Sequence, residues 1–179
     1  LLNRPGGASG PNGFIVPFEL ATDEVQNYEI GAKTEFLDRQ VRLNVSAFYV
    51  DISNLQTTIF DPSIVNLFFS DNAADAEIWG VEAELTYAPY DIPGLTFSGA
   101  FSILDTEITK VLTPTDDVEL GSDLAYAPNF QGNARVRYQW ALNADLDAYV
   151  MPQVAHSSSK YTDIIKINRW KLDGYTASA

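Results

Sequence analysis

Cysteine is absent from the 179 residues of this chain, and histidine occurs once, as His156. Without cysteine the chain has no disulfide framework, no thiolate metal site and no cysteine nucleophile, and one histidine offers almost nothing for a histidine-based metal site or catalytic dyad. Basic residues are also few, because 11 Lys and Arg stand against 24 Asp and Glu and leave a net charge of −13. We therefore expect no nucleic-acid partner, since contacts with phosphates need clustered cations.

Long apolar runs are missing as well, and no stretch approaches the roughly 18 apolar residues of a membrane-spanning helix. This absence does not exclude a membrane protein, because a β-barrel crosses lipid with alternate residues only. The content of 46% hydrophobic and 12% aromatic residues is too high for a disordered acidic tail. The chain opens without the features of a signal peptide, so we expect it to be a segment of a longer protein.

What is present is a two-residue periodicity. Apolar and polar side chains alternate along six stretches, which predicts β-strands with two different faces. The predicted strands are Tyr28 to Phe36, Val41 to Val50, Trp79 to Tyr87, Leu95 to Ile103, Phe130 to Trp140 and Leu146 to Ala155, with the opening of another at Leu172 to Thr176. Residues 1–27 are rich in Gly and Pro and are expected to be mostly loop, with one short extended piece at Phe14 to Leu20.

The connections between these strands alternate between short and long. The short ones suit antiparallel hairpins, so all short turns are expected at one end of the sheet and all long loops at the other. The long loops are predicted at Asp51 to Ile78, Leu104 to Asn129 and His156 to Lys171. The segment Leu55 to Phe69 is too apolar for a solvated loop, so it either extends the strands or contacts a ligand or partner, and we favour strand extension.

The two predicted faces differ sharply in chemistry. One face carries no charged residue and has aromatic residues eight positions apart on three strands, namely Tyr28 with Phe36, Trp79 with Tyr87, and Phe130 with Tyr138, followed by Trp140. The other face is polar. Its charged residues include Glu29, Lys33, Glu35, Arg42, Glu82, Glu84, Arg135 and Arg137.

Two architectures produce such faces. In a soluble extracellular β-sandwich that binds carbohydrate or protein, the apolar face packs against a second sheet; in an outer-membrane barrel it meets lipid. The eight-residue aromatic interval spans about 20 Å along the barrel axis, close to an apolar band of about 25 Å between aromatic girdles. The segregated loops and the many small residues on the apolar face also favour an antiparallel transmembrane β-barrel.

Several segments together resemble one known family. The sequence from Asn27 to Phe36 (NYEIGAKTEF) is followed by VRLN at Val41 to Asn44 and AFY at Ala47 to Tyr49, and then by Asn72 to Leu85 (NAADAEIWGVEAEL). Shorter matches occur at Asn54-Leu55-Gln56, Ala127-Pro128-Asn129 and Asp173-Gly174-Tyr175-Thr176. Over most of Asn27 to Thr176 the chain thereby resembles the C-terminal barrel region of TonB-dependent outer-membrane receptors.

This resemblance implies a location in the Gram-negative outer membrane and a barrel of about 22 strands, of which residues 1–179 supply about seven. The plug domain, its energiser-binding box and the final strands lie outside the chain. The implied function is active import of a scarce ligand, such as an iron–siderophore complex, cobalamin or an oligosaccharide, powered by a TonB-type energiser acting through the absent plug. The implied partners are membrane lipid, the energiser and a small-molecule or chelate ligand, with no cofactor and no enzymatic activity.

The polar-face residues named above are the candidates for ligand contact or gating. The alternative, which we favour, is that a polar lumen wall pairs its carboxylates with Arg42, Arg135 and Arg137. The aromatic residues of the apolar face are the candidates for membrane girdles. We expect no metal site: Asp71, Asp75 and Glu77 lack calcium-loop spacing and are expected in a solvated loop, and His156 is expected at a loop base.

Overall fold

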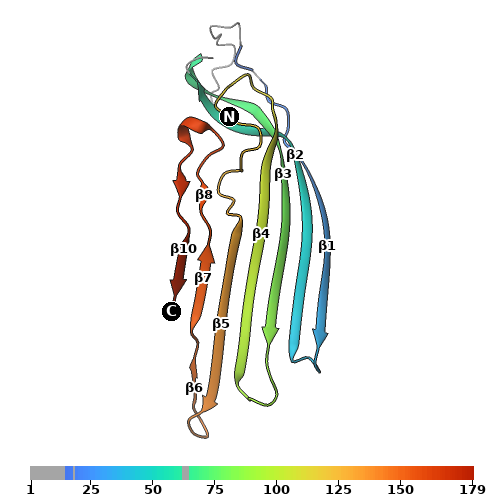
Figure 1. Cartoon of the computed structure of the whole chain (residues 1–179), viewed down its shortest axis with the longest axis vertical. Coiled ribbons are helices and arrows are strands. Elements are labelled where there is room, and N and C mark those ends of the chain that lie inside the picture. Colours follow the sequence, from blue (N-terminus) through green and yellow to red (C-terminus); the bar gives the residue numbers. More distant parts are fainter. Residues whose placement is uncertain (1–14, 18, 62–64) are drawn as a thin grey trace.

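The computed structural model describes residues 15–17, 19–61 and 65–179, most of which form one antiparallel sheet (Figure 1). The sheet has the order β1-β2-β3-β4-β5-β7-β10, and β6 also pairs with β5. Its strands are β1 (Glu24–Phe36), β2 (Val41–Asp61), β3 (Val65–Tyr87), β4 (Leu95–Val111), β5 (Phe130–Ala141), β6 (Asp147–Val150), β7 (Gln153–Ser157) and β10 (Tyr175–Ser178). A separate pair consists of β8 (Lys160–Tyr161) and β9 (Lys171–Leu172), and a 3-10 turn covers Lys166–Asn168. No helix in the described ranges is long and apolar enough to cross a membrane.

Strands β6 and β7 pair with β5 in one continuous register. Tyr138 pairs with Val150, and Arg135 pairs with Gln153, so the register does not shift across the gap. The gap contains Pro152, which has no N–H to donate, although its carbonyl accepts a hydrogen bond from the Val136 amide at 3.0 Å. The short turns lie at one end of the sheet and the long loops at the other, as the sequence predicts (Figure 1).

The strands next to the long loops run further than the alternation predicts. Strand β2 continues to Asp61 and β3 begins at Val65, so the preference for strand extension over Leu55 to Phe69 is confirmed wherever the structure describes that segment. The chemical alternation stops before the strands end because Asp51 and Glu77 place charged side chains at positions that continue the apolar face. The register shifts lie further along, between Ile52 and Leu55 and between Asp75 and Ala76. A bulge changes which face a side chain occupies, so the pattern is broken there as well while the strand continues.

Several loop assignments are therefore wrong. Asp71, Asp75 and Glu77 lie on β3, and His156 lies on β7, where its Nδ1 is 2.7 Å from Thr176 Oγ1. The expected loop from Leu104 is strand until Val111. The extended piece at Phe14 to Leu20 is reduced to a bridge residue at Ile15 among its described positions, and the first strand begins at Glu24, earlier than expected.

The register confirms that the predicted apolar residues share a face. Tyr49 pairs with Tyr28 on one side and Trp79 on the other, and Val45 pairs in the same way with Ala32 and Ala83. These side chains are open to the surroundings: Ile30 is 78% exposed and Val81 41%. Across the described residues no second sheet covers this face. A β-sandwich requires such a sheet, so the structure does not support that alternative.

The buried core lies at the loop end of the sheet. Ala76 and Ile108 pair with each other and continue the alternation of the polar face, yet both are fully buried. They belong to a cluster that also contains Val16, Ile59, Phe69, Ala73, Ala74, Val118, Ile164 and Ile165. Residues from the segments 112–129 and 158–174 therefore fold over the polar face at this end. We call this set the loop core.

Gly94 ends the short turn between β3 and β4 and has a φ of +86°, a conformation that side chains with a Cβ rarely adopt. A Cβ at this position would meet the Gln139 carbonyl oxygen on β5. The turn therefore needs glycine for its backbone angle and for a close approach of two chains.

We predict that Gly94→Ala lowers the free energy of unfolding of the full-length protein by at least about 2 kcal/mol, because strain and a backbone clash combine. Urea titration of the refolded protein in detergent measures this change. Gly99→Ala is the control, since it has an ordinary φ and its nearest new contact is 3.3 Å away. Equal losses in the two variants would contradict the role assigned to Gly94.

Candidate functional site

The polar face carries a hollow of about 400 Å³ formed by β1, β2 and β3. Its charged and polar side chains are Glu29, Lys33, Asn44, Ser46, Glu82 and Glu84. They meet because the register places Lys33 and Glu84 on either side of Asn44, and Glu82 opposite Ser46. We call this the polar hollow. Four of the eight predicted ligand-contact candidates are thus brought together.

The other four candidates lie elsewhere on the polar face. Arg42 donates to Glu35 at 3.0 Å near the short-turn end, and Arg39 lies 3.8 Å from the same carboxylate. Arg137 lies over the ring of Tyr149 at 4.7 Å, and Arg135 is on the same strand. The expectation that the wall carboxylates pair with Arg42, Arg135 and Arg137 holds for Arg42 alone among the described residues.

The polar hollow offers binding rather than bond-making chemistry. Glu84 accepts a hydrogen bond from Asn44 at 3.2 Å, which orients one carboxylate. Three carboxylates, one ammonium and small polar groups can hold cationic or hydrogen-bonding partners. In the described ranges no group of three or more carboxylate, histidine or cysteine side chains is arranged so that it could hold a metal ion.

A second polar site joins two loops that lie far apart in the sequence. Lys166 Nζ is 2.6 Å from Glu119 Oε1, and the Lys166 amide donates to the Asp117 carbonyl at 2.7 Å. Beneath this contact Val118 bridges to Ile165, and both are buried in the loop core. Nothing in the sequence spacing indicates that these loops meet, so sequence analysis missed this site.

Arg169 extends this loop contact. Its guanidinium lies 4.0 Å from Glu119, 3.9 Å from Asp123 and 3.9 Å from the centre of the Tyr161 ring. Among the described residues its Nε and the Ser122 Oγ are buried without a hydrogen-bond partner, beside an open hollow of about 480 Å³. The loop contact is therefore held by ion pairs and stacking that leave some polar groups unsatisfied.

The hydrogen bond from Lys166 lowers the pKa of Glu119, and the same hydrogen bond raises the pKa of Lys166. Because the Glu119 pKa is lowered in the folded protein, ionised Glu119 stabilises the contact at pH values above the ordinary Glu pKa. This stabilisation is lost as the pH falls through the lowered pKa. Because the Lys166 pKa is raised in the folded protein, charged Lys166 stabilises the contact at pH values below the ordinary Lys pKa. This stabilisation is lost as the pH rises through the raised pKa. The contact is therefore strongest between these two limits.

We predict that Glu119→Gln loosens the two loops, because Lys166 and Arg169 both lose a charged partner. Amide hydrogen exchange in segment 164–168 should accelerate about twofold to fivefold at neutral pH, as expected for an exposed pair. At a pH below the lowered Glu119 pKa the variant and the parent should exchange alike. Asp145→Asn, in the short turn at the opposite end, should change nothing, and acceleration in both variants would contradict this account.

The predicted girdle aromatics form contacts along the apolar face. Tyr28 and Trp79 lie in a row with Tyr49, which the sequence-based set omitted, with ring centres 6.3 Å and 4.4 Å apart. Towards the short-turn end, further aromatic contacts occur between Tyr87 and Phe97 at 6.0 Å and between Tyr138 and Trp140 at 5.7 Å. Phe130 instead lies 5.9 Å from the His156 ring, and Phe36 is 45% exposed at the end of β1.

Comparison with known proteins agrees with this architecture. A family model described as TonB dependent receptor-like, beta-barrel, matches residues 3–178. The metal-pseudopaline receptor CntO of Pseudomonas aeruginosa is 27% identical over 163 residues, which are 84% of this chain and 22% of that protein. The chain therefore spans about a fifth of the length of this curated relative.

Solved structures share the fold. The siderophore receptor PiuA from Acinetobacter baumannii superimposes with a TM-score of 0.63 at 22% identity, over 86% of this chain and 21% of that one. BauA, the ferric preacinetobactin receptor of the same organism, gives a TM-score of 0.62 at 19% identity, over 98% of this chain and 25% of that one.

Proposed function

This chain belongs to the family of TonB-dependent receptor-like β-barrels, and on that premise we propose that its parent protein imports a scarce metal chelate across the outer membrane. The family and the structural neighbours are transport receptors of the Gram-negative outer membrane. In this proposal the described strands form part of the barrel wall, residues 1–179 belong to the barrel domain, and ligand import requires no covalent chemistry.

The observation that carries the proposal is the two-faced single sheet. No described segment packs over its apolar face, which has aromatic contacts towards both ends, as expected where lipid meets a barrel wall. We assign the row of Tyr28, Tyr49 and Trp79 to the outer girdle and the Tyr87, Phe97, Tyr138 and Trp140 contacts to the inner girdle. The polar face then lines the lumen, as in barrels that conduct or enclose polar solutes.

The relatives support a chelate as the ligand. Their names refer to metal-pseudopaline, a siderophore and ferric preacinetobactin. The polar hollow, with Glu29, Lys33, Glu82 and Glu84, is proposed to contact either the ligand or the plug inside the lumen. The loops joined by Glu119 and Lys166 would lie over the outer mouth of the lumen, because the loop core covers the polar face there.

Energy for import is proposed to come from a TonB-type energiser that acts on a plug domain. The partner contacts would lie on that domain, so the wall described by β1 to β10 would meet the energiser only through it. This arrangement leaves the wall with two tasks: to hold the lipid boundary and to guide the ligand.

Uptake assays in a receptor-deletion strain test the proposal. Cells that express the full-length protein should accumulate labelled ferric or other metal chelates, and should lose this uptake when the energiser gene is deleted. Energiser-dependent uptake of cobalamin or an oligosaccharide in place of every chelate would change the ligand class. Uptake that persists without the energiser would contradict the mechanism.

The face assignment predicts opposite effects for neighbouring residues of β3. Val81→Arg places a charge on the lipid face and should cost about 2–4 kcal/mol near the middle of the bilayer, so barrel assembly should fail. Heat-dependent migration on SDS gels measures the assembled fraction of the full-length protein. Glu82→Leu, on the lumen face, is the matched control and should assemble. The reverse result would exchange the two faces.

A further inference from the structure

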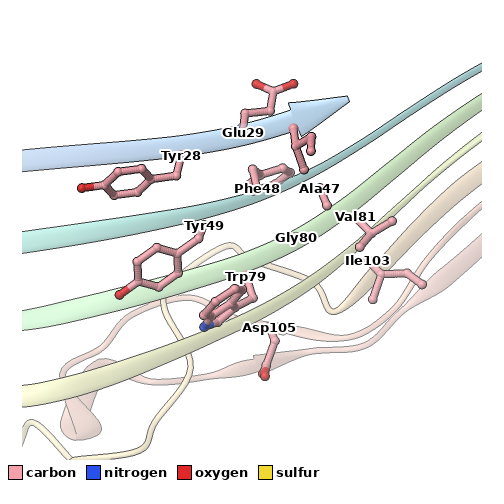
Figure 2. Close-up of a pocket in the computed structure, with 11 residues that line it drawn as sticks. Tyr28, Glu29, Ala47, Phe48, Tyr49, Trp79, Gly80, Val81, Ile103 and Asp105 are labelled. Carbon is pink, nitrogen blue, oxygen red and sulfur yellow. The ribbon is translucent and has the colours of Figure 1, made fainter. Parts of the chain in front are cut away.

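Strands β2 and β3 continue towards the long loops beyond Tyr49 and Trp79, whose rings Figure 2 shows on one side of the sheet. In the proposed function these rings mark the outer membrane boundary, so the strand ends beyond them surround the mouth of the lumen. Two asparagines lie there on neighbouring strands, Asn54 on β2 and Asn72 on β3. Both form hydrogen bonds with residues 19–23, which precede β1 and which we call the strap.

Asn54 lies in a bulge of β2, where the register with β3 shifts between Ile52 and Leu55. Its φ of +60° is in the left-handed region, which asparagine adopts more readily than most residues. The bulge takes the backbone groups of Asn54 out of the ladder, and two side chains of β3 replace the lost partners. The Asn54 amide donates to Asp75 Oδ1 at 2.9 Å, and the Asn54 carbonyl accepts from Asn72 Nδ2 at 2.6 Å. The bulge therefore directs the Asn54 carbonyl towards Asn72.

The side-chain amide of Asn72 also binds both backbone groups of Ala21 in the strap. Asn72 Oδ1 accepts from the Ala21 amide at 2.9 Å, and Asn72 Nδ2 donates to the Ala21 carbonyl at 2.9 Å. Gln56 Nε2 on β2 donates to the same carbonyl at 2.9 Å. In the sheet β2 separates β1 from β3, so Asn72 reaches the strap across β2. Both donor hydrogens and the oxygen of the Asn72 amide are thus in use.

The residues on either side of Asn72 fix a second loop at the same place. Asp71 Oδ2 accepts a hydrogen bond from Thr113 Oγ1 at 2.8 Å, and the Ala73 carbonyl accepts one from the Leu112 amide at 2.8 Å. Ala73 is also fully buried in the loop core. Three successive positions of β3 therefore hold the strap, the segment after β4 and the loop core in one arrangement.

We propose that Asn72 is a positioning residue for ligand binding, which holds the strap across β2 so that the mouth of the lumen has its binding shape before a metal chelate arrives. Val16, which is 1% exposed in the loop core, anchors the chain on one side of the strap, and β1 anchors it on the other. Asn72 holds it between these two anchors. The inference rests on the proposed function in one respect, namely that a chelate enters at the long-loop end of the sheet.

A preformed mouth affects how a chelate binds, because ordering a loop on binding costs conformational entropy. Side-chain hydrogen bonds that already fix the strap avoid this cost. Amide hydrogen exchange in the strap should therefore be slow without chelate and unchanged when chelate is added. Loss of the Asn72 hydrogen bonds should raise the KM for uptake about twofold to tenfold, the effect of ordering one side chain on binding, and should leave the maximal rate unchanged.

Two substitutions of Asn72 in the full-length protein test the proposal. Asn72→Asp keeps an oxygen for the Ala21 amide but replaces both donor hydrogens with an oxygen that faces two carbonyls. Asn72→Ala removes the same donors without adding a charge beside Asp71 and Asp75. In both variants exchange in the strap should accelerate at least about twofold, as expected for the loss of an exposed hydrogen bond.

Exchange is measured by mass spectrometry on the refolded receptor, and uptake is measured in cells and divided by the assembled fraction from heat-dependent migration. The probe is the radiolabelled metal chelate that gives the highest energiser-dependent uptake in the parent. Asn143→Asp is the matched control. Asn143 Oδ1 accepts from the Asp145 amide at 2.9 Å in the short turn at the opposite end, and an aspartate there keeps this bond. The control should change neither exchange in the strap nor the KM.

The remaining outcomes separate this inference from the proposed function. An unchanged KM in variants whose strap exchanges faster would overturn the inference and leave chelate import intact. Slower exchange in the strap of the parent on addition of chelate would also overturn it, because the mouth would then close on its ligand. Strap exchange that is the same in the parent and both Asn72 variants would contradict the tether itself. Absence of energiser-dependent uptake in the parent would contradict the proposed function, and this inference with it.

Discussion

The structure depends on one constraint: every backbone N–H and C=O of a wall must find a partner within the sheet, while side chains of opposite character leave on opposite faces. Antiparallel pairing meets the first condition and the two-residue period meets the second. A slip of one residue in any strand would move its entire apolar set to the polar face. The pairing of Tyr49 with both Tyr28 and Trp79 shows how closely three strands keep the same register. The aromatic row and the polar hollow both follow from it.

The loop end departs from this pattern. There the polar-face positions become apolar, at Ala76 and Ile108, and the loops fold over them to build the loop core. Elsewhere in the described part of the chain the sheet buries few side chains, because no second layer packs on its apolar face. The ion pair between Glu119 and Lys166 orients the two loops relative to each other. The apolar contact between Val118 and Ile165 lies beneath this ion pair, where the same two loops meet. The chain thus combines a sheet that is open on both faces with the buried loop core at one end.

Much of the fold could be predicted from alternation alone. The six predicted strands exist, their faces are correct, and the segregation of short and long connections holds. The errors came where charged residues occupy positions that continue the apolar face: at Asp51 and Glu77 the chemical alternation ends while strand pairing continues, so Asp75 and Glu77 were placed in a loop. The candidate site could be predicted from the sequence in part. Glu29, Lys33, Glu82 and Glu84 were expected on one face and do meet, but the separation of Arg135 and Arg137 from them depends on how many strands lie between.

The sequence by itself determined the strands, the two faces and the family, because a period of two and a run of family-like segments are properties of the chain's order. Only the tertiary structure decided which side chains become neighbours. Register sets Glu77 between Asp51 and Glu107, and loop packing brings Glu119 to Lys166. Neither contact is encoded in sequence spacing. Each arises because strands and loops far apart along the chain are held side by side by backbone pairing and by the burial of the loop core.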